Sequence, residues 1–441
     1  MTRLRFLTVW IFVLPIFGFR ASAQDSLYAR RVIETLTSPE FHGRGYAFHG
    51  DSIAARFISA EFSRLQLKKW TNNYYQSYNN FSINVFEGHT KVDFGKNYPS
   101  SSQSDAMQII PYSAETKGKF RIVSANDKML KDTNAFKLND KFVLVDMLKF
   151  TLVDTVKLGQ NITFNEKEDQ WRKIIRRNSL NAKGYIVLNE KLGAYSPISG
   201  RTKSSHTTIY LLKDSVSGSL KKASIDLDAR FIENYQTQNI CGYVEGKLYP
   251  DTFFVFGAHY DHLGQIGESY YFPGANDNAA GVAMVMDLAR HYSLPENRPD
   301  YSMVFIAFSG EEIGLLGSSH FVENAPFPLE NVKMMLNLDV MGSGEDGFTF
   351  VCGQVFPEEF EKFARINEEK NYAPKLLARE ASSNSDHAPF YKKGCKAMFI
   401  YGMGKTGKYH HPSDTLENLS LGGYNSLFRL IVDYIKLHDT P

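Results

Sequence analysis

Apolar and polar residues follow patterns along the chain that predict both helices and strands. Between residues 50 and 67 apolar side chains recur at the spacing of an amphipathic helix. The stretch 72–135 is rich in Ser, Asn, Gly and Tyr and predicts strands and loops. Residues 141–147 then predict a buried strand, and residues 171–189 predict a helix, a turn and a second strand. These last two stretches together indicate a small α/β unit.

The pattern changes after Asn239. Four apolar runs, at 253–259, 303–309, 333–339 and 397–401, show no clean alternation of polar and apolar residues, which is typical of strands covered on both faces. Helical patterns lie between and after them, at 278–292, 312–324 and 423–437. Strands that alternate with helices predict an α/β fold, with a mostly parallel central sheet flanked by helices.

The first 23 residues have the pattern of a cleaved export signal. Arg3 and Arg5 precede an apolar run at residues 6–19, and Ala21-Ser22-Ala23 provides a small-x-small cleavage site. The apolar run falls short of the roughly 20 residues that a membrane-spanning helix needs. We therefore expect a secreted or periplasmic protein with a mature chain from about Gln24 and no stable membrane association.

Length and composition indicate how many domains to expect and which kinds of binding partner to exclude. The 441 residues exceed the usual size of one hydrophobic core, so a large domain with a smaller one is expected. Without the first 23 residues, 47 basic residues face 48 acidic ones. This near balance gives no field that would attract nucleic acid or an acidic membrane surface. The three cysteines, Cys241, Cys352 and Cys395, allow one disulfide or buried thiols.

Histidine and acidic residues collect at the predicted carboxyl ends of the strands, the edge where open α/β sheets bind ligands. Three carboxylates and two imidazoles converging there would repel and lose hydration, so a cation is the natural counter-charge. Oxygen and nitrogen ligands without thiolates suit zinc, although manganese or cobalt would also fit. The segments concerned are His259–His262, Gly274–Asn278, Gly310–Glu312, Asp339 and Tyr409–His411.

Six motifs in these segments resemble the two-zinc peptidase family that includes bacterial leucine aminopeptidases and glutamate carboxypeptidase. They lie in the family's order over about 160 residues, which makes the set specific although each motif alone is weak. The motifs are GAHYDHLG (257–264), GANDNAAG (274–281), FSGEEIGLLGS (308–318), NLDVMG (337–342), SDHAPF (385–390) and YHHPSDT (409–415). The resemblance implies a zinc-exopeptidase fold, phosphorylase/hydrolase-like, in a secreted aminopeptidase acting on peptide substrates.

The resemblance also implies a role for each residue. His259 and Asp339 match the ligands of one Zn²⁺, Glu312 and His410 those of a second, and Asp277 the carboxylate that bridges both. The position of Asp414 in its motif selects His410 over His411. Glu311 matches the general base, Asp261 the carboxylate that orients His259, and Tyr409 a tyrosine that stabilises the tetrahedral intermediate. Asp386 and His387 match residues that support the site, and the Asp277-Asn278 peptide is expected to be cis.

In the mechanism that follows, a metal-bridged hydroxide attacks the scissile carbonyl while Glu311 moves the proton. Two Zn²⁺, three carboxylates and one hydroxide bring the site to zero net charge. Adjacent side chains at Glu311 and Glu312 point different ways in extended or turn backbone, so one can bind metal while the other faces the water.

The resemblance extends to the domain organisation. EFHGRG (40–45) and the helix after it resemble the start of the catalytic domain, and TQNICGYVEG (237–246) its resumption. We expect a signal peptide at 1–23, catalytic-domain segments at 24–99 and 225–441, and an inserted, protease-associated-like α/β domain at 100–224. Extra catalytic-domain strands are the alternative interpretation of the insert.

Other activities share this fold. A glutamate carboxypeptidase-like enzyme and a glutaminyl cyclase are the enzymatic alternatives, although GANDNAAG and SGEEIGLLGS are closer to the peptidase pattern. A binding protein on an inactive peptidase fold is the non-enzymatic alternative. Such proteins lose ligands, whereas this chain keeps the five ligand positions and the base.

Overall fold

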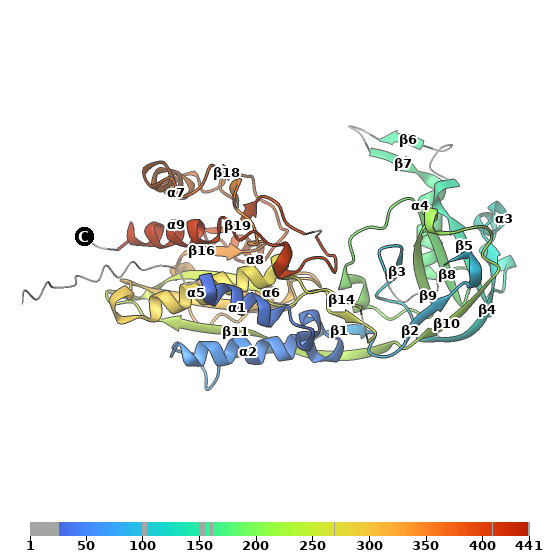
Figure 1. Ribbon diagram of the computed structural model, residues 1–441, viewed down its shortest axis with the longest axis horizontal. Helices are drawn as coiled ribbons and strands as arrows, with labels where there is room; N and C mark the ends of the chain where they lie inside the picture. Colours follow the sequence, from blue (N-terminus) through green and yellow to red (C-terminus); the bar gives the residue numbers. More distant parts are fainter. Residues whose placement is uncertain are drawn as a thin grey trace, which may run out of the picture.

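The computed structural model describes residues 26–98, 104–149, 155–158, 162–268, 270–407 and 409–439. The expected signal peptide and the expected mature terminus at Gln24 lie outside these residues. The described residues form two lobes, each built on its own sheet (Figure 1). No helix in the described residues combines the length and the apolar character that crossing a membrane requires.

The large lobe contains an eight-stranded sheet. Its four central strands, β15, β12, β16 and β19, run parallel, as the apolar runs predict. Antiparallel pairs occur towards both edges, where β11 joins β15 and β17 joins β19. In spatial order the strands are β1 (Tyr75–Val85), β11 (Arg230–Val244), β15 (Tyr301–Phe308), β12 (Tyr249–His259), β16 (Val332–Leu338), β19 (Ala397–Met403), β17 (Gly347–Val351) and β18 (Leu376–Ala378).

Both faces of the central strands are buried. Along β12, Phe254 and Phe256 belong to one hydrophobic cluster, and Phe253 and Val255 belong to another. This division explains why the strand sequence shows no polar alternation. The first cluster contains residues of α1 (Ser26–Leu36), α2 (Gly50–Arg64), α5 (Ala280–Ser293), α7 (Pro357–Lys370) and α9 (Tyr424–Lys436), and the second contains residues of α6 (Leu316–Glu323) and α8 (His387–Lys392).

The helix predictions hold apart from two boundaries. Helix α4 (Glu166–Arg177) begins before residue 171, where the pattern predicted its start. Helices α2, α5 and α9 lie where the periodicity places them. Helix α6 begins at Leu316, whereas the pattern predicted a start at residue 312, because residues 311–315 form bends and turns. Glu311 and Glu312 therefore stand in a turn between a strand and a helix.

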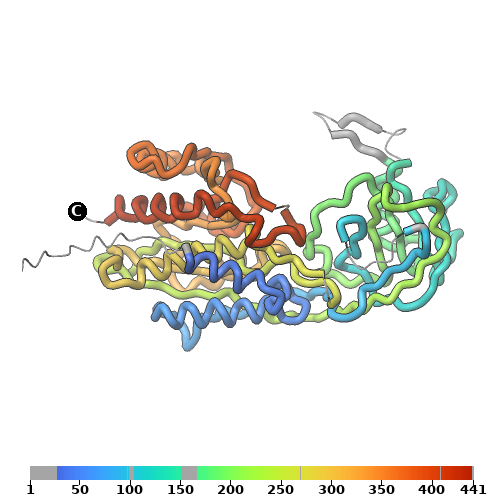
Figure 2. The backbone as a smooth tube through the Cα atoms, in the orientation of Figure 1, coloured from blue at the N-terminus to red at the C-terminus, as the bar shows by residue number. Residues whose placement is uncertain are grey.

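The smaller lobe is inserted between β1 and β11, as the path of the backbone shows (Figure 2). Its sheet takes in residues 90–227, so it includes β2, which precedes residue 100. The sheet order is β2 (Thr90–Asp93), β10 (Lys222–Leu227), β4 (Thr116–Ser124), β5 (Lys141–Asp146), β8 (Gly184–Asn189), β9 (Thr207–Leu212) and β3 (Met107–Ile109). The lobe also contains α3 (Asp127–Lys131), α4 (Glu166–Arg177) and the hairpin of β6 (Thr155–Leu158) and β7 (Ile162–Asn165).

Apolar packing joins the two lobes. Leu263, Ile266 and Phe272, which follow β12 in the large lobe, share one hydrophobic cluster with Ile209 and Leu211 of the insert. The short strands β13 (Gln265–Ile266) and β14 (Tyr270–Tyr271) form this junction. The three cysteines are all buried and free, so no disulfide contributes.

Candidate metal centre

The structure places the predicted ligands at one edge of the large sheet. His259 ends β12, Asp339 follows β16, and Glu312 lies in the turn after β15. Asp277 lies in the turn 275–279 that leads into α5, and His410 lies in the loop after β19. His259, Asp277, Glu312 and Asp339 are buried, and His410 is nearly so.

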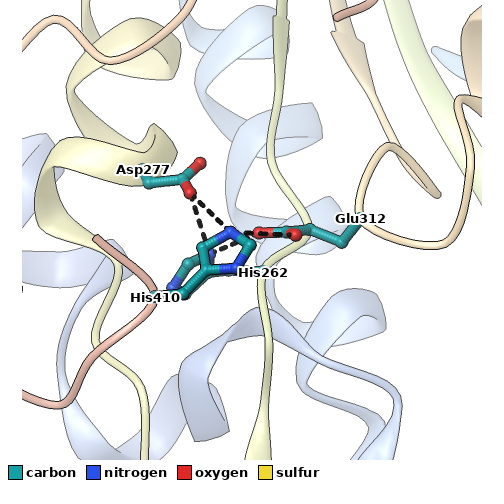
Figure 3. Close-up of side chains that lie close together, drawn as sticks. All are labelled: His262, Asp277, Glu312 and His410. Carbon is teal, nitrogen blue, oxygen red and sulfur yellow. Dashed lines mark hydrogen bonds and ion pairs between the residues drawn. The ribbon is translucent and has the colours of Figure 1, made fainter. Parts of the chain in front are cut away.

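Asp277 occupies the middle of this cluster. Its Oδ1 lies 3.2 Å from Nε2 of His259, and its Oδ2 lies 3.1 Å from Nε2 of His410. The candidate ligand atoms form two groups that share Asp277, each with its atoms within 4.8 Å of one another. One group is His259, Asp277 and Asp339; the other is His262, Asp277, Glu312 and His410, whose side chains converge in Figure 3.

The cluster has the chemistry of a cation site. In the described part of the chain, no ion pair joins a lysine or arginine to its carboxylates. Oδ2 of Asp277 contacts Nε2 of His410, which also contacts Glu312. Nε2 of His262 is buried and makes no hydrogen bond among the described residues. Buried polar atoms without partners are costly, and oxygen and imidazole donors suit zinc. The donor set therefore fits a pair of zinc ions.

Surrounding side chains hold the turn that carries Asp277. Oδ1 and Oδ2 of Asp414 accept hydrogen bonds from the backbone N–H groups of Asn276 and Asp277, at 2.8 and 3.1 Å. The side chain of Asn278 donates to the carbonyl of Leu338, next to Asp339. The Asp277-Asn278 peptide is cis, which confirms that prediction. Two candidate ligands from distant segments are thus fixed relative to each other.

Asp261 makes different contacts from those expected. Nδ1 of His259 bonds to the main-chain carbonyl of Asp261 at 3.0 Å, and the nearest carboxylate oxygen of Asp261 lies 3.9 Å away. The carboxylate instead accepts from the backbone N–H groups of Glu311 and Glu312, and from the hydroxyl of Tyr46 at 3.0 Å. Asp261 thus orients His259 through its backbone and holds the glutamate turn with its side chain.

Glu311 and Glu312 have opposite electrostatic surroundings. Burial raises the pKa of Glu311 well above its usual range, and nearby Asp386 and Glu312 add to the rise. Burial and Asp277 would also raise the pKa of Glu312, but His410 and His262 lower it to about 2. Nδ1 of His262 lies 2.7 Å from Oε1 of Glu312. The surroundings of Glu311 thus favour its protonated form, whereas those of Glu312 favour the carboxylate.

Tyr409 and the histidine beside His410 lie at the rim. The ring of Tyr409 stacks on that of His410, with centroids 3.8 Å apart, and Tyr409 is 61% exposed. Nε2 of His411 lies 2.9 Å from Asp105 of the insert, so it points away from the cluster. The structure thus brings His410 to the cluster and leaves His411 outside it.

Asp386 and His387 lie behind the cluster and belong to neither ligand group. Both are fully buried. Burial raises the pKa of Asp386 to about 7 and lowers that of His387 to about 4. Ser385, the residue before them, donates a 2.6 Å hydrogen bond to Asp339. Ser385 thus holds the side chain of the candidate ligand Asp339.

Two residues near the cluster were given no role in the sequence analysis. His262 belongs to the HYDH motif, and its position three residues after His259 could have indicated that it lies near the cluster. Arg44, in the EFHGRG motif, is fully buried. Its guanidinium donates to five main-chain carbonyls, among them those of Tyr260 at 2.8 Å, Gly274 at 2.7 Å and Asp277 at 3.3 Å. Arg44 thus holds the segment that follows His259 close to the turn that contains Asp277.

A cleft of about 270 Å³ opens beside His410, where the two lobes meet. The insert and the large lobe both contribute to its walls, so a molecule in the cleft would touch both. Among its lining residues are Asp105, Gln108, Tyr195, Phe272 and Tyr409.

Comparison with known proteins agrees with this site. Residues 239–435 match the model of Peptidase family M28. The chain is similar to an aminopeptidase from Bacillus subtilis, with 29% identity over 264 residues that cover 57% of this chain and 56% of that protein. It is also similar to a probable zinc metalloprotease from Pyrenophora tritici-repentis, with 36% identity over 27% of this chain and 28% of that protein. The chain thus spans about half or less of the length of these curated relatives.

Solved structures match over nearly the whole chain. A zinc aminopeptidase from Bacillus subtilis aligns with a TM-score of 0.65 and 21% identity, covering 95% of this chain and 96% of that one. An aminopeptidase from Aneurinibacillus aligns with a TM-score of 0.61 and 19% identity, covering 95% of each chain. At this identity the likeness establishes the fold, including the presence of both lobes.

Proposed function

We propose that the chain, whose residues 239–435 match the model of Peptidase family M28, is a zinc-dependent aminopeptidase. The observation that carries the proposal is Asp277, whose two oxygens face different histidines in a buried cluster. A carboxylate placed in this way can join two cations. The names of the relatives, an aminopeptidase and zinc metalloproteases, support peptides as substrates.

We assign two zinc ions to each chain. His259 and Asp339 would hold one, Glu312 and His410 would hold the other, and Asp277 would be shared between them. His262 orients Glu312 through its 2.7 Å contact. When bound, the two ions supply Lewis acidity toward the scissile carbonyl and a water of lowered pKa.

Glu311 serves as the general base and then as the acid. Its side chain is partly exposed in the turn that Asp261 holds, directly beside Glu312. It accepts the proton of the attacking water and delivers it to the leaving amine. In this proposal Tyr409 donates a hydrogen bond to the developing oxyanion, and its stacking on His410 at the rim of the cluster supports that role.

Substrate assays with metal analysis test this function. We expect about two zinc ions per chain, cleavage of aminoacyl substrates, loss of activity on chelation and recovery with zinc. Preference for peptides with a blocked N-terminus would instead indicate a glutamate carboxypeptidase-like enzyme. Cyclisation of N-terminal glutamine without hydrolysis would indicate a glutaminyl cyclase. A chain that binds no zinc would contradict the proposal.

Export and the nature of the insert are part of the same proposal. We propose a secreted or periplasmic enzyme whose mature chain starts at about Gln24, and a protease-associated-like domain at about residues 100–224. The cleavage pattern at Ala21-Ser22-Ala23 supports export. Mass spectrometry of the exported protein is the test, and a peptide that still contains Arg3 or Arg5 would contradict it.

A further inference from the structure

One loop of the insert contacts both segments that carry the ligands of the second zinc site. This loop, residues 192–202, is called the insert loop. The carbonyl of its Tyr195 accepts a 2.7 Å hydrogen bond from Nδ1 of His410. The guanidinium of its Arg201 donates to the carbonyl of Ile313 at 3.2 Å. Because Ile313 directly follows Glu312, the insert loop contacts the second site from two sides.

Buried packing fixes the position of the insert loop. Tyr195 is 6% exposed, and its ring stacks on Phe272 of the large lobe with centroids 5.1 Å apart and planes 18° apart. Both rings belong to the hydrophobic cluster that joins the lobes. The carbonyl of Tyr195 is therefore held at a defined place relative to His410 by the core of the junction.

The contact to His410 has a chemical consequence. A histidine that donates through one ring nitrogen presents the other without a proton, which is the form that binds metal. The donated bond also fixes the ring orientation, and its loss typically costs 10–100-fold in metal affinity. His259 differs, because its Nδ1 bonds to a carbonyl of its own lobe at Asp261. Asp339 is likewise held from within the large lobe, by Ser385.

We propose that the insert loop is a positioning device for the zinc site of Glu312 and His410. Zinc affinity at this site depends on the insert, whereas affinity at the site of His259 and Asp339 does not. The inference rests on the proposed function, since it presumes that the cluster binds two zinc ions. Tyr195 and Arg201 are positioning residues in this scheme, acting through His410 and through the backbone after Glu312.

Zinc titration of the chelator-treated full chain by calorimetry tests the proposal, with Tyr195→Ala and Arg201→Met as variants. Tyr195→Ala removes the stacked ring that anchors the carbonyl, and Arg201→Met removes the bond to Ile313. Each is expected to weaken one of two zinc-binding events by about 10–100-fold and leave the other unchanged. Tyr195→Phe keeps the ring and the carbonyl, so it should bind zinc like the wild type.

Two controls separate positioning from general loosening of the insert. Arg121→Met removes an exposed arginine from β4, and Tyr210→Ala removes a partly buried tyrosine from β9 that packs in another cluster of the insert. Both should keep two tight zinc sites. Arg201→Met, on the surface of the junction, keeps the test decisive if Tyr195→Ala does not fold.

Combining variants identifies which site responds. The effect of Tyr195→Ala on zinc affinity should disappear in a Glu312→Gln background, where the second site is already damaged. It should persist in an Asp339→Asn background, where the first site is damaged instead. Two unchanged sites in both insert-loop variants, or equal weakening of both sites, would overturn the proposal. A wild-type chain that binds fewer than two zinc ions would overturn the proposed function itself.

Discussion

The two lobes contain sheets of similar design, but in the part of the chain that the structure describes, acidic residues at the strand ends are paired with a basic residue in the insert and not in the large lobe. In each, four central strands run parallel, and loops gather at their carboxyl ends. In the insert, Asp146 at the end of β5 pairs with Lys213 after β9 at 2.8 Å. In the large lobe, the carboxylates at this edge face histidines and have no lysine or arginine partner among the described residues. Both sheets have an edge of strand ends where a ligand could bind. Only in the large lobe do the carboxylates at that edge lack a lysine or arginine partner within the described ranges, which makes it a candidate cation site.

Histidines in the two lobes show the same contrast. Burial lowers the pKa of His206 in the insert to about 4, because its neighbours are neutral rings and a hydroxyl. Burial also opposes protonation of His410, but Glu312 and Asp277 raise its pKa to about 10. Histidine is thus held neutral in the insert, whereas the carboxylates around His410 favour a positive charge at that position.

The largest effect is expected where the two zinc sites meet. Asp277→Asn keeps the shape of the side chain but removes the charge shared by both groups. Loss of metal-assisted catalysis costs several kcal/mol of transition-state stabilisation, so turnover should fall about a thousandfold or more. Zinc content and turnover measure the effect. Full zinc content and an unchanged rate would show that Asp277 is no bridge.

Replacing the adjacent glutamates separates proton transfer from metal binding. Glu311→Gln removes a base and should lower turnover by about 10²–10⁴-fold while the chain keeps its zinc. Glu312→Gln should reduce zinc content as well as the rate. Metal analysis beside the kinetics distinguishes them. Equal loss of zinc in both variants would contradict the division of roles.

Arg44 tests whether the large lobe depends on buried positive charge outside the metal sites. Arg44→Met leaves several buried carbonyls without donors, and each unsatisfied group costs about 1–3 kcal/mol. The free energy of unfolding should fall by at least about 3 kcal/mol. Denaturant unfolding of the zinc-loaded chain measures it. Arg44→Lys, which keeps the charge and fewer donors, should lie between the wild type and Arg44→Met.

His206 gives the insert a predictable response to acid. Its pKa is about 4 in the folded chain and about 6.5 when unfolded, so the unfolded state takes up a proton first. Its contribution to stability is complete above about pH 6.5 and is lost as the pH falls toward about 4. Between pH 7 and pH 5 the loss is on the order of 2 kcal/mol. His206→Gln should flatten this part of the dependence of unfolding free energy on pH, and an unchanged slope would contradict the assignment.

The smallest effect is expected at the ion pair of the insert. Lys213→Met leaves Asp146 without its partner, but the lysine is 39% exposed, and such pairs contribute about 0.2–1 kcal/mol. Stability should fall by no more than about 1 kcal/mol, with zinc content and turnover unchanged. A large loss of zinc would show that charge in the insert acts on the metal centre, which would weaken the contrast between the lobes.

The sequence by itself determined the core of the large lobe and the residues gathered at its edge. Apolar runs such as 253–259 identify β12 because strands buried on both faces need apolar residues at every position. The motifs, through their family resemblance, identified His259, Asp277, Glu312, Asp339 and His410, which the structure brings together. The strand positions and the candidate ligands depend on residue type and on order along the chain, so both can be recognised in the sequence before folding is considered.

Only the tertiary structure decided how these residues are held. The carbonyl of Tyr195 that accepts from His410 leaves no signal in the sequence, because every residue has a carbonyl. The backbone contact of Asp261 to His259, and the five carbonyls gathered by Arg44, depend on chain segments far apart in sequence meeting in space. The sequence specifies the chemistry of each side chain directly. Main-chain hydrogen bonds between distant segments, in contrast, form only once packing has fixed their distance and direction.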